Sequence, residues 1–499
     1  MSQDTAVRAG DPLLTRLADA ILIPPFPGLS APRWITEALG RGLAGVTLFG
    51  QNLSAPGQIA ALTAALRDAS AGVAEPVIAI DEEGGDVTRV AYADGSPYPG
   101  NAALGAVDDV ELTRSVYGAI GADLAGLGIN LDLAPCADVL GTADSPAVGT
   151  RSFGAGTALV ARHTAAAVAG LQGAGVAACT KHFPGHGRTG TDTHEALATI
   201  EGSLADLRRR DLPPFAAAIA AGTIAVMPSH LRLPELTGDL PASVSVAAIT
   251  GLLRGELGFT GVIVSDALEM RATRDMFGIP GAAVRAVAAG TDLVCLGRAG
   301  SEEEYLAVRA ALVAAAQDGT LDPGRLEEAV DRVARLRGGL ARARLPGGGV
   351  FPGAGGRAEI GLAAARRAVR MVGPRRPLRQ PLIVEIEPRE NIAAGQFGWG
   401  LGPWAPPGSV RRVGYGEAAA GILAEAAGRS LVLAVRDAHR DRGGRALVSA
   451  LLTARPDLVL VEMGLPLWPP PDGTSYLATY GASRASARAA AELLGLADP

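Results

Sequence analysis

Residues Val77-Ile78-Ala79-Ile80-Asp81-Glu82-Glu83-Gly84-Gly85 form an apolar run, mostly β-branched, that stops at three carboxylates and two glycines. A short apolar run that ends in polar, glycine-rich residues is typical of a buried β-strand. Seven further runs of this kind lie in the first 300 residues. The eight predicted strands are residues 20–23, 45–49, 77–81, 129–134, 176–180, 224–227, 262–266 and 293–296. Their nearly continuous apolar character indicates burial on both faces.

Alanine- and leucine-rich stretches between these runs are long enough for helices, which makes the repeating unit β-α. The clearest are residues 55–69, 109–127, 154–173 and 203–221, and two more follow at 304–317 and 323–344. Eight such units predict a (β/α)8 barrel of the TIM type. An open, doubly wound sheet is the structural alternative. In either fold, functional groups are expected at the carboxyl ends of the strands.

A second domain is predicted after the barrel. Residues 345–356 are rich in glycine and proline and are interpreted as a linker between a catalytic barrel, residues 1–344, and a C-terminal domain, residues 357–499. A helical stretch at 357–372 opens this domain, and alanine-rich helices separate its strand-like runs. This pattern predicts a smaller α/β layered domain resembling an αβα sandwich. The runs are residues 382–386, 431–435, 458–462 and 476–480.

Composition argues against several classes of function. Apolar residues make up 48% of the 499 residues, charged residues 19%, and the net charge is -6, so no polybasic surface for nucleic acid or membrane is expected. No apolar run has the length of a membrane span and no signal-like segment opens the chain, from which we expect a cytoplasmic protein. Cys136, Cys179 and Cys295 lie far apart in apolar runs and are expected to be reduced core residues.

The chain contains a single lysine, Lys181, among 45 lysine and arginine residues. A compact ammonium therefore suits this position better than a guanidinium fork. Lys181 opens residues 181–194, which also hold three of the six histidines. We expect the reaction centre in this segment.

Two carboxylates and one histidine are the candidates for catalysis. Asp266 ends the seventh predicted strand and could act as a nucleophile or a base, although an aspartate here could equally cap the following helix. His194 follows Asp192 by two residues in a glycine- and threonine-rich loop. A carboxylate that fixes one imidazole nitrogen leaves the other able to give and take a proton near neutral pH. His186 is interpreted as a surface or loop-shaping residue.

Other charged groups near the strand ends suit the hydroxyl groups of a sugar. Asp81 and Arg89 flank a Glu-Glu-Gly-Gly turn, and Arg151 follows the fourth strand. Glu82 and Glu83 are expected in buried ion pairs that support the loops. The spacing of the histidines matches no standard zinc pattern, so neither a metal nor a cofactor is expected.

As a set, these residues resemble family 3 glycoside hydrolases, in particular the β-N-acetylhexosaminidase branch that trims N-acetylglucosamine during cell-wall recycling. Five blocks carry the resemblance, and they span the whole barrel. They are Asp81-Glu82-Glu83-Gly84-Gly85, residues 130–138 with 149–154, Lys181-His182-Phe183-Pro184-Gly185-His186-Gly187, Asp192-Thr193-His194, and Ser265-Asp266-Ala267-Leu268-Glu269-Met270.

The resemblance implies a retaining exo-β-N-acetylglucosaminidase. It implies that Asp266 is the nucleophile and forms a covalent glycosyl-enzyme, and that His194, oriented by Asp192, is the acid/base. Terminal N-acetylglucosamine would be released from cell-wall or chitin-derived oligosaccharides. The implied sugar-binding positions are Asp81, Arg89, Arg151, Lys181 and His182, with Met227 and His230 nearby.

This chain departs from the pattern of the branch at two positions. Thr193 stands where serine is expected, and Arg188 stands where an acidic or small residue is common. The second change bears on what binds next to the leaving group.

Three alternatives remain open at this point. Imidazole does not repel an incoming anion as a carboxylate does, so phosphate could replace water as acceptor and make the enzyme a phosphorylase. A β-glucosidase would normally take its proton donor from a carboxylate outside the 181–194 segment. A non-catalytic sugar-binding protein is disfavoured by the joint presence of Asp266, Asp192 and His194.

Overall fold

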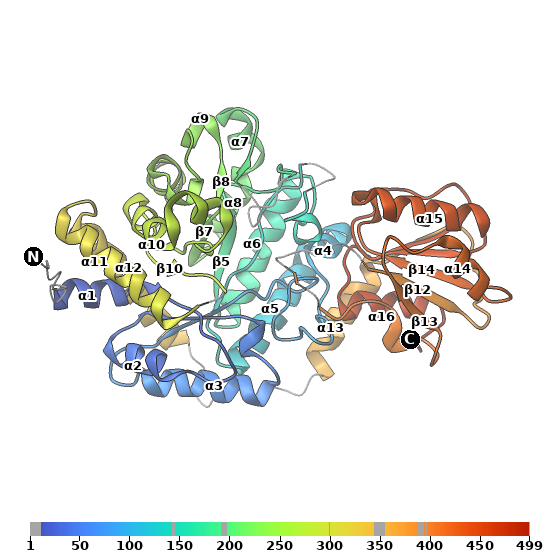
Figure 1. Ribbon diagram of the computed structural model, residues 1–499, viewed down its shortest axis with the longest axis horizontal. Helices are drawn as coiled ribbons and strands as arrows, with labels where there is room; N and C mark the ends of the chain where they lie inside the picture. Colours follow the sequence, from blue (N-terminus) through green and yellow to red (C-terminus); the bar gives the residue numbers. More distant parts are fainter. Residues whose placement is uncertain are drawn as a thin grey trace, which may run out of the picture.

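The computed structural model describes residues 11–141, 145–190, 197–298, 300–343, 355–387, 394–395 and 397–498. Two α/β units follow each other along the chain, the first coloured blue to yellow and the second orange to red in Figure 1. The predicted linker lies outside the described residues, except that Gly355 and Gly356 already belong to helix α13. The boundary between the two domains therefore stays a prediction.

Eight parallel strands of the described chain form the predicted barrel. Six of them make one sheet in the order β2-β3-β4-β5-β7-β9, and β1 pairs with β10. A parallel bridge from Val264 to Leu293 joins β9 to β10, and Thr47 Oγ1 of β2 donates a hydrogen bond to the carbonyl of Ile23 in β1. The strands are β1 (Leu22–Ile23), β2 (Gly45–Leu48), β3 (Val77–Ile80), β4 (Leu131–Asp132), β5 (Ala177–Phe183), β7 (Ala225–Pro228), β9 (Val262–Ile263) and β10 (Val294–Cys295).

Helices surround these strands, because the strands are apolar on both faces and must be covered (Figure 1). A small parallel pair, β6 (Ala198–Thr199) with β8 (Leu231–Arg232), is added beside β7. The helices are α1 (Pro12–Asp19), α2 (Arg33–Arg41), α3 (Pro56–Ala69), α4 (Asn101–Val107), α5 (Val110–Gly126), α6 (Thr157–Gly173), α7 (Leu204–Arg210), α8 (Leu212–Ala220), α9 (Pro234–Thr237), η4 (Ala247–Glu256), α10 (Arg271–Ala289), α11 (Glu302–Asp318) and α12 (Pro323–Ala343), with short turns η1 (Gly50–Asn52), η2 (Gly149–Arg151) and η3 (Ala242–Val244).

The second unit is a six-stranded sheet between two layers of helices. Its strand order is β11-β16-β15-β14-β12-β13, parallel except for the edge strand β11. The strands are β11 (Arg370–Val372), β12 (Leu382–Ile386), β13 (Val410–Val413), β14 (Leu431–Val435), β15 (Val459–Glu462) and β16 (Ser475–Ala478). The helices are α13 (Gly355–Ala368), α14 (Ala419–Glu425), α15 (Arg442–Ala454) and α16 (Arg484–Leu493), with short turns η5 (Gly402–Trp404) and η6 (Ala438–Arg440).

Alternate residues of the central strands feed two separate cores, as the period of two in a strand requires. Leu431, Leu433 and Val435 pack with α14 and α15, whereas Val432 and Ala434 pack with α13 and α16. Both faces of the sheet are thereby covered, which confirms the predicted α/β layered domain.

The structure differs from the sequence predictions at both edges of this sheet. The helix predicted over 357–372 ends at Ala368, and Arg370–Val372 forms β11, antiparallel to β16. Strand β13 was not predicted, because Arg411 and Arg412 interrupt its apolar pattern. An edge strand needs only one neighbouring strand and one covered face, so the apolar pattern in its sequence is weaker.

Helix α13 joins the two units. Ala364 packs into the core of the barrel, and Ala365 packs into the core of the second unit. Gly361 lies so close to the barrel that a Cβ there would be 2.0 Å from the carbonyl oxygen of Pro97.

In the described part of the chain, no single helix has the length and apolar character needed to cross a membrane. One pair of helices bent by 97°, Pro234–Val244 with Ala247–Glu256, meets the criterion by length and composition only.

Candidate active site

A cavity of about 680 Å³ opens at the carboxyl ends of the barrel strands. Most of the sequence-predicted site residues in the described chain line it, and they come from strands or loops that are far apart in the sequence. These are Asp81 after β3, Arg89, Arg151 in η2, Lys181 and His182 in β5, Met227 in β7, and Asp266 after β9. The structure therefore brings together residues that the sequence only suggested as a set.

Lys181 is buried at the floor of this cavity, with 2% of the residue exposed. Its Nζ lies 2.5 Å from Asp81 Oδ1 and 2.8 Å from Glu83 Oε1. Burial alone lowers the pKa of Lys181, but the two carboxylates outweigh it and raise the pKa above the usual value. The lysine is therefore a permanent cation that holds Asp81 in place.

Glu83 binds Arg151 through two parallel hydrogen bonds. Arg151 Nε donates to Glu83 Oε2 at 2.9 Å, and Nη2 donates to Oε1 at 2.6 Å. Burial raises the pKa of Glu83, yet Arg151 and Lys181 more than reverse this and hold the pKa well below its usual range. The expected ion pair of Glu83 is confirmed. Glu82 instead accepts hydrogen bonds from the backbone of Arg89 and Val90 and shapes the loop.

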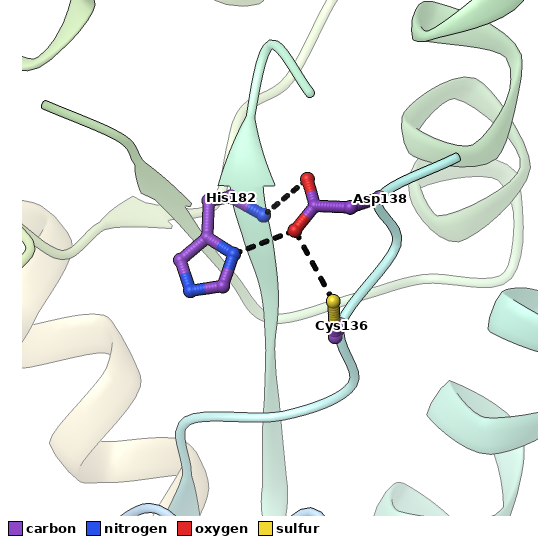
Figure 2. A group of neighbouring side chains, drawn as sticks. All are labelled: Cys136, Asp138 and His182. Atoms are coloured by element: carbon purple, nitrogen blue, oxygen red, sulfur yellow. Dashed lines mark hydrogen bonds and ion pairs between the residues drawn. The ribbon is translucent and has the colours of Figure 1, made fainter. Parts of the chain in front are cut away.

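His182 is fixed by a buried carboxylate that the sequence did not single out (Figure 2). Asp138 Oδ2 lies 2.7 Å from His182 Nδ1 and accepts a hydrogen bond from the Cys136 thiol at 3.1 Å. Burial raises the pKa of Asp138, but the nearby His182 and His186 outweigh it, so Asp138 remains ionised and only accepts. Nδ1 of His182 is therefore the donor, and Nε2 faces Arg151 Nη2 at 3.2 Å.

Cys136, Asp138 and His182 place one ligand atom each within 4.8 Å of one another, a spacing that a metal ion could also use. Each of these atoms already has a hydrogen-bond partner within the group. Burial raises the pKa of the Cys136 thiol, which stays protonated and serves as a donor rather than as a thiolate ligand. A hydrogen-bond network accounts for the cluster.

Asp266 does not cap the helix that follows it. Helix α10 begins at Arg271 with Met270 at its N-cap position, whereas Asp266 Oδ1 accepts a hydrogen bond from the backbone of Ala267 at 2.7 Å. The side chain is half-buried and lines the cavity. The capping alternative is wrong, and a rigid carboxylate facing the cavity remains.

His230 lies outside the cavity wall and is fully buried. Its Nε2 lies 3.0 Å from the carbonyl oxygen of Ala267, and its Nδ1 lies 2.6 Å from Ser243 Oγ. A carbonyl only accepts, so Nε2 carries the proton. These contacts support a role in holding the loop of Asp266 rather than in touching a sugar.

His194 and Asp192 lie outside the described residues. His186, in the same segment of sequence, lines the cavity, and its backbone N–H donates to Asp138 Oδ1 at 2.6 Å. The loop-shaping interpretation of His186 agrees with that contact, and the surface interpretation is wrong because the residue is buried.

Several cavity residues were not among the sequence candidates. Some of these lining residues belong to the barrel, and no local sequence pattern marks them. Ala394 and Gly395 come from the second unit, so the cavity has walls from both units. The additional lining residues include Tyr92, Glu269, Arg298, Ala394 and Gly395.

Another cavity, of about 600 Å³, lies at the opposite end of the barrel beside α3 and α5. Its charged residues include Arg67 and Glu75, which pair with each other at 2.6 Å. The amino ends of barrel strands serve stability rather than catalysis. The functional site is therefore assigned to the cavity of Asp266 and Lys181.

Comparison with known proteins agrees with this geometry. Residues 32–336 match the model of the glycosyl hydrolase family 3 N terminal domain. The chain is 38% identical to a β-hexosaminidase of Stenotrophomonas maltophilia (strain K279a) over 257 residues, which is 50% of this chain and 75% of the relative. It is 33% identical to β-hexosaminidase A of Pseudoalteromonas piscicida over 333 residues, covering 61% of this chain but only 55% of that relative.

Among solved structures, a glycoside hydrolase family 3 β-N-acetylglucosaminidase from Paenibacillus sp. str. FPU-7 matches with a TM-score of 0.86. The two sequences are 32% identical, and 97% of each chain is covered. The chain belongs to glycosyl hydrolase family 3. Within that family it is an enzyme of the β-N-acetylhexosaminidase group, as the resemblance predicted.

Proposed function

We propose that this enzyme is a retaining exo-β-N-acetylglucosaminidase that releases terminal N-acetylglucosamine from cell-wall or chitin-derived oligosaccharides. One observation carries the proposal: the carboxylate of Asp266 lines the same cavity as the buried Lys181–Asp81 pair and Arg151. A nucleophile and fixed polar groups thus surround a space of about 680 Å³. Small-molecule sites have this size and this mixture of surfaces.

In this proposal, Asp81 accepts hydrogen bonds from hydroxyl groups of the terminal sugar. Within the described chain, only its Oδ1 is engaged, by Lys181, while the side chain is 19% exposed to the cavity. Oδ2 is thus available to a ligand. Arg89, Arg151, Lys181 and His182 supply the donors and acceptors around it.

The proposed reaction has two displacement steps. Asp266 attacks the anomeric carbon while the bond to the leaving oxygen breaks, and His194 gives that oxygen a proton. His194 then takes a proton from water, whose oxygen attacks the same carbon and releases Asp266. Two inversions at one carbon leave its configuration unchanged.

His194 and Asp192 enter this proposal from the sequence. Support for their placement comes from His186, eight residues before His194, which lines the cavity. An imidazole paired with a carboxylate is basic enough to act in both steps near neutral pH.

Replacing Asp266 with alanine tests the nucleophile. We expect Asp266→Ala to lower kcat on a chromogenic N-acetylglucosaminide by at least about 1,000-fold, because no covalent intermediate can form. Binding of N-acetylglucosamine, measured by calorimetry, should persist. Asp275→Ala removes an exposed aspartate in α10 and serves as the control, with unchanged turnover. Near-normal turnover by Asp266→Ala would refute the assignment.

Product analysis shows whether water or phosphate is the acceptor, and parallel assays show which sugar is the preferred substrate. Hydrolysis releases free N-acetylglucosamine whether or not millimolar phosphate is present, whereas phosphorolysis releases its 1-phosphate only with phosphate. We expect the free sugar in both cases. Parallel assays with a glucoside, a chitin oligosaccharide and a cell-wall disaccharide define the substrate, and a preference for the glucoside would contradict the proposal.

A further inference from the structure

The second unit contacts the barrel through a buried carboxylate, Asp86, in the turn after β3. Asp86 Oδ2 accepts hydrogen bonds from Thr150 Oγ1 at 2.9 Å and from Arg436 Nη2 at 3.1 Å. Asp86 Oδ1 accepts one from the backbone N–H of Ala482 at 2.7 Å. Arg436 follows β14 and Ala482 precedes α16, so two of these three donors belong to the second unit.

Asp86 and Glu83 belong to one turn and hold two consecutive residues. Glu83 binds the side chain of Arg151, and Asp86 binds the side chain of Thr150. The first contact is made within the barrel. The contact between Asp86 and Thr150 differs, because the remaining hydrogen bonds of Asp86 come from the second unit. The position of η2 therefore depends on both units.

Arg440 holds the same loop from another side. Its Nη2 donates to the carbonyl of Ser145 at 2.9 Å. Gly149 adopts φ +47°, and a Cβ there would lie 2.9 Å from Arg440 Nη2, so glycine lets the guanidinium approach the backbone of η2.

The second unit fixes the position of Arg436 independently of Asp86. Its guanidinium lies over the rings of Phe397 and Trp399, 4.7 Å and 5.6 Å from their centroids. Such stacking orients a planar guanidinium, which then has little freedom to follow a moving carboxylate. The guanidinium of Arg436 is therefore a rigid donor, and its position determines where the carboxylate of Asp86 lies.

We propose that Arg436 is a positioning residue for Arg151, acting through Asp86 and Thr150, so that docking of the second unit sets the affinity of the barrel for its sugar. The inference rests on the proposed function, in which Arg151 binds the sugar. The chain from Arg436 to Arg151 consists of two hydrogen bonds and one peptide bond. The second unit thus contributes to sugar binding without a charged side chain of its own in the cavity wall of the described chain.

The test compares Arg436→Met with Thr150→Val, which removes the hydroxyl at nearly constant shape, and with Thr150→Ser, which keeps it. KM and kcat are measured on a chromogenic N-acetylglucosaminide with full-length enzyme, and the melting temperature of each variant is recorded. We expect Arg436→Met and Thr150→Val each to raise KM about five- to tenfold with kcat within about twofold. Thr150→Ser should restore a KM close to that of the wild type.

The double variant Arg436→Met/Thr150→Val separates one shared path from two separate effects. We expect its KM to match that of the worse single variant, because both changes act through Asp86. Arg366→Met is the matched control, since it removes an exposed guanidinium that pairs with Glu492 inside the second unit. It should leave KM unchanged.

The inference is overturned if KM is unchanged in both single variants, if their effects multiply in the double variant, or if Thr150→Ser is as impaired as Thr150→Val. A lower melting temperature with unchanged KM also overturns it, because that result indicates a structural role alone. If Arg436→Met does not fold, the two Thr150 variants decide. Failure of the wild type to turn over the N-acetylglucosaminide would instead refute the proposed function.

Discussion

The ammonium of Lys181 pairs with the carboxylates of Asp81 and Glu83, which would otherwise repel each other at the base of the cavity. Glu83 Oε1 accepts from both Lys181, at 2.8 Å, and Arg151, at 2.6 Å. This oxygen can serve two cations because one of them is a compact ammonium. A second planar guanidinium would compete with Arg151 for the same place. The geometry explains why the single lysine of the chain stands here.

The first prediction concerns this lysine. Lys181→Arg should lower kcat/KM on an N-acetylglucosaminide by about 100-fold or more, because the larger fork displaces Arg151 from Glu83. Steady-state kinetics measure the effect, and the melting temperature shows whether the fold persists. Arg366→Lys exchanges the same two residue types at an exposed arginine that pairs with Glu492, and it should leave kcat/KM unchanged. A fully active Lys181→Arg variant would show that charge alone suffices.

Some site residues could be predicted from the sequence, and others could not. Asp81, Lys181 and Asp266 follow or belong to largely apolar strands of a barrel, so their convergence follows from the fold. The resemblance implied that His230 lies near the sugar-binding residues, but it contacts the loop of Asp266 instead. Asp138 was missed because its partner His182 is 44 residues away and no local pattern links them.

At the scale of the element, α13 is the part that fixes how the two units meet. It contributes alanines to both cores, and Gly361 lets it approach the barrel backbone closely. Small residues are required on both sides of such a helix. Its alanine-rich sequence predicts the helix but not this double contact.

The second prediction tests that approach. Gly361→Ala places a Cβ 2.0 Å from the carbonyl oxygen of Pro97, so the helix or the turn must move. We expect the free energy of unfolding to fall by about 2 kcal/mol or more, as in other overpacked sites. Chemical denaturation measures it.

Gly339→Ala in α12 is the control for this substitution. A Cβ there meets nothing within 4 Å, so the change should be neutral or stabilising by up to about 1 kcal/mol. If Gly361→Ala were as stable as Gly339→Ala, the close packing of α13 would be contradicted.

The barrel strands were predictable because they lie in largely apolar runs, as strands buried on both faces do. The residues at which these strands begin and end were less predictable. Only Leu22–Ile23 of the run 20–23 forms β1, since the barrel sets the pairing length and not the run itself. In the second unit, only Val369 separates α13 from β11, and no turn residue marks the end of the helix in the sequence.

At the scale of the molecule, one buried acid links stability to pH. Glu462 ends β15 and accepts hydrogen bonds from the backbone of Asp437 and Gly464. Burial, assisted by the carboxylate of Asp437, raises the pKa of Glu462 to about 8. The folded protein therefore keeps a proton that the unfolded chain has lost above its ordinary pKa of 4.5.

The third prediction follows from this difference. Between about pH 5 and pH 8, the contribution of Glu462 to the free energy of unfolding falls as pH rises, because the folded state binds more protons. Glu462→Gln stays neutral, so its stability relative to the wild type should increase across this range by more than about 1 kcal/mol. Denaturation at several pH values measures the difference. A difference that does not change with pH would contradict the prediction.

Contacts between the two units could not be predicted from the sequence. Asp86 and Arg436 are 350 residues apart, and neither stands out by its neighbours in the sequence. The layered fold of each unit follows from local periodicity. Their docking depends on single residues such as Gly361 and Asp86, whose partners only the folded chain reveals.

The proposed mechanism requires a covalent intermediate on Asp266, which can be trapped and identified. The enzyme is mixed with an activated N-acetylglucosaminide, quenched in acid during turnover, digested and analysed by mass spectrometry. We expect one N-acetylglucosaminyl group on the peptide that contains Asp266, and we expect His194→Ala to increase its amount by slowing its hydrolysis. A sugar attached to another residue, or its absence from Asp266 in both proteins during demonstrated turnover, would show that Asp266 is not the nucleophile.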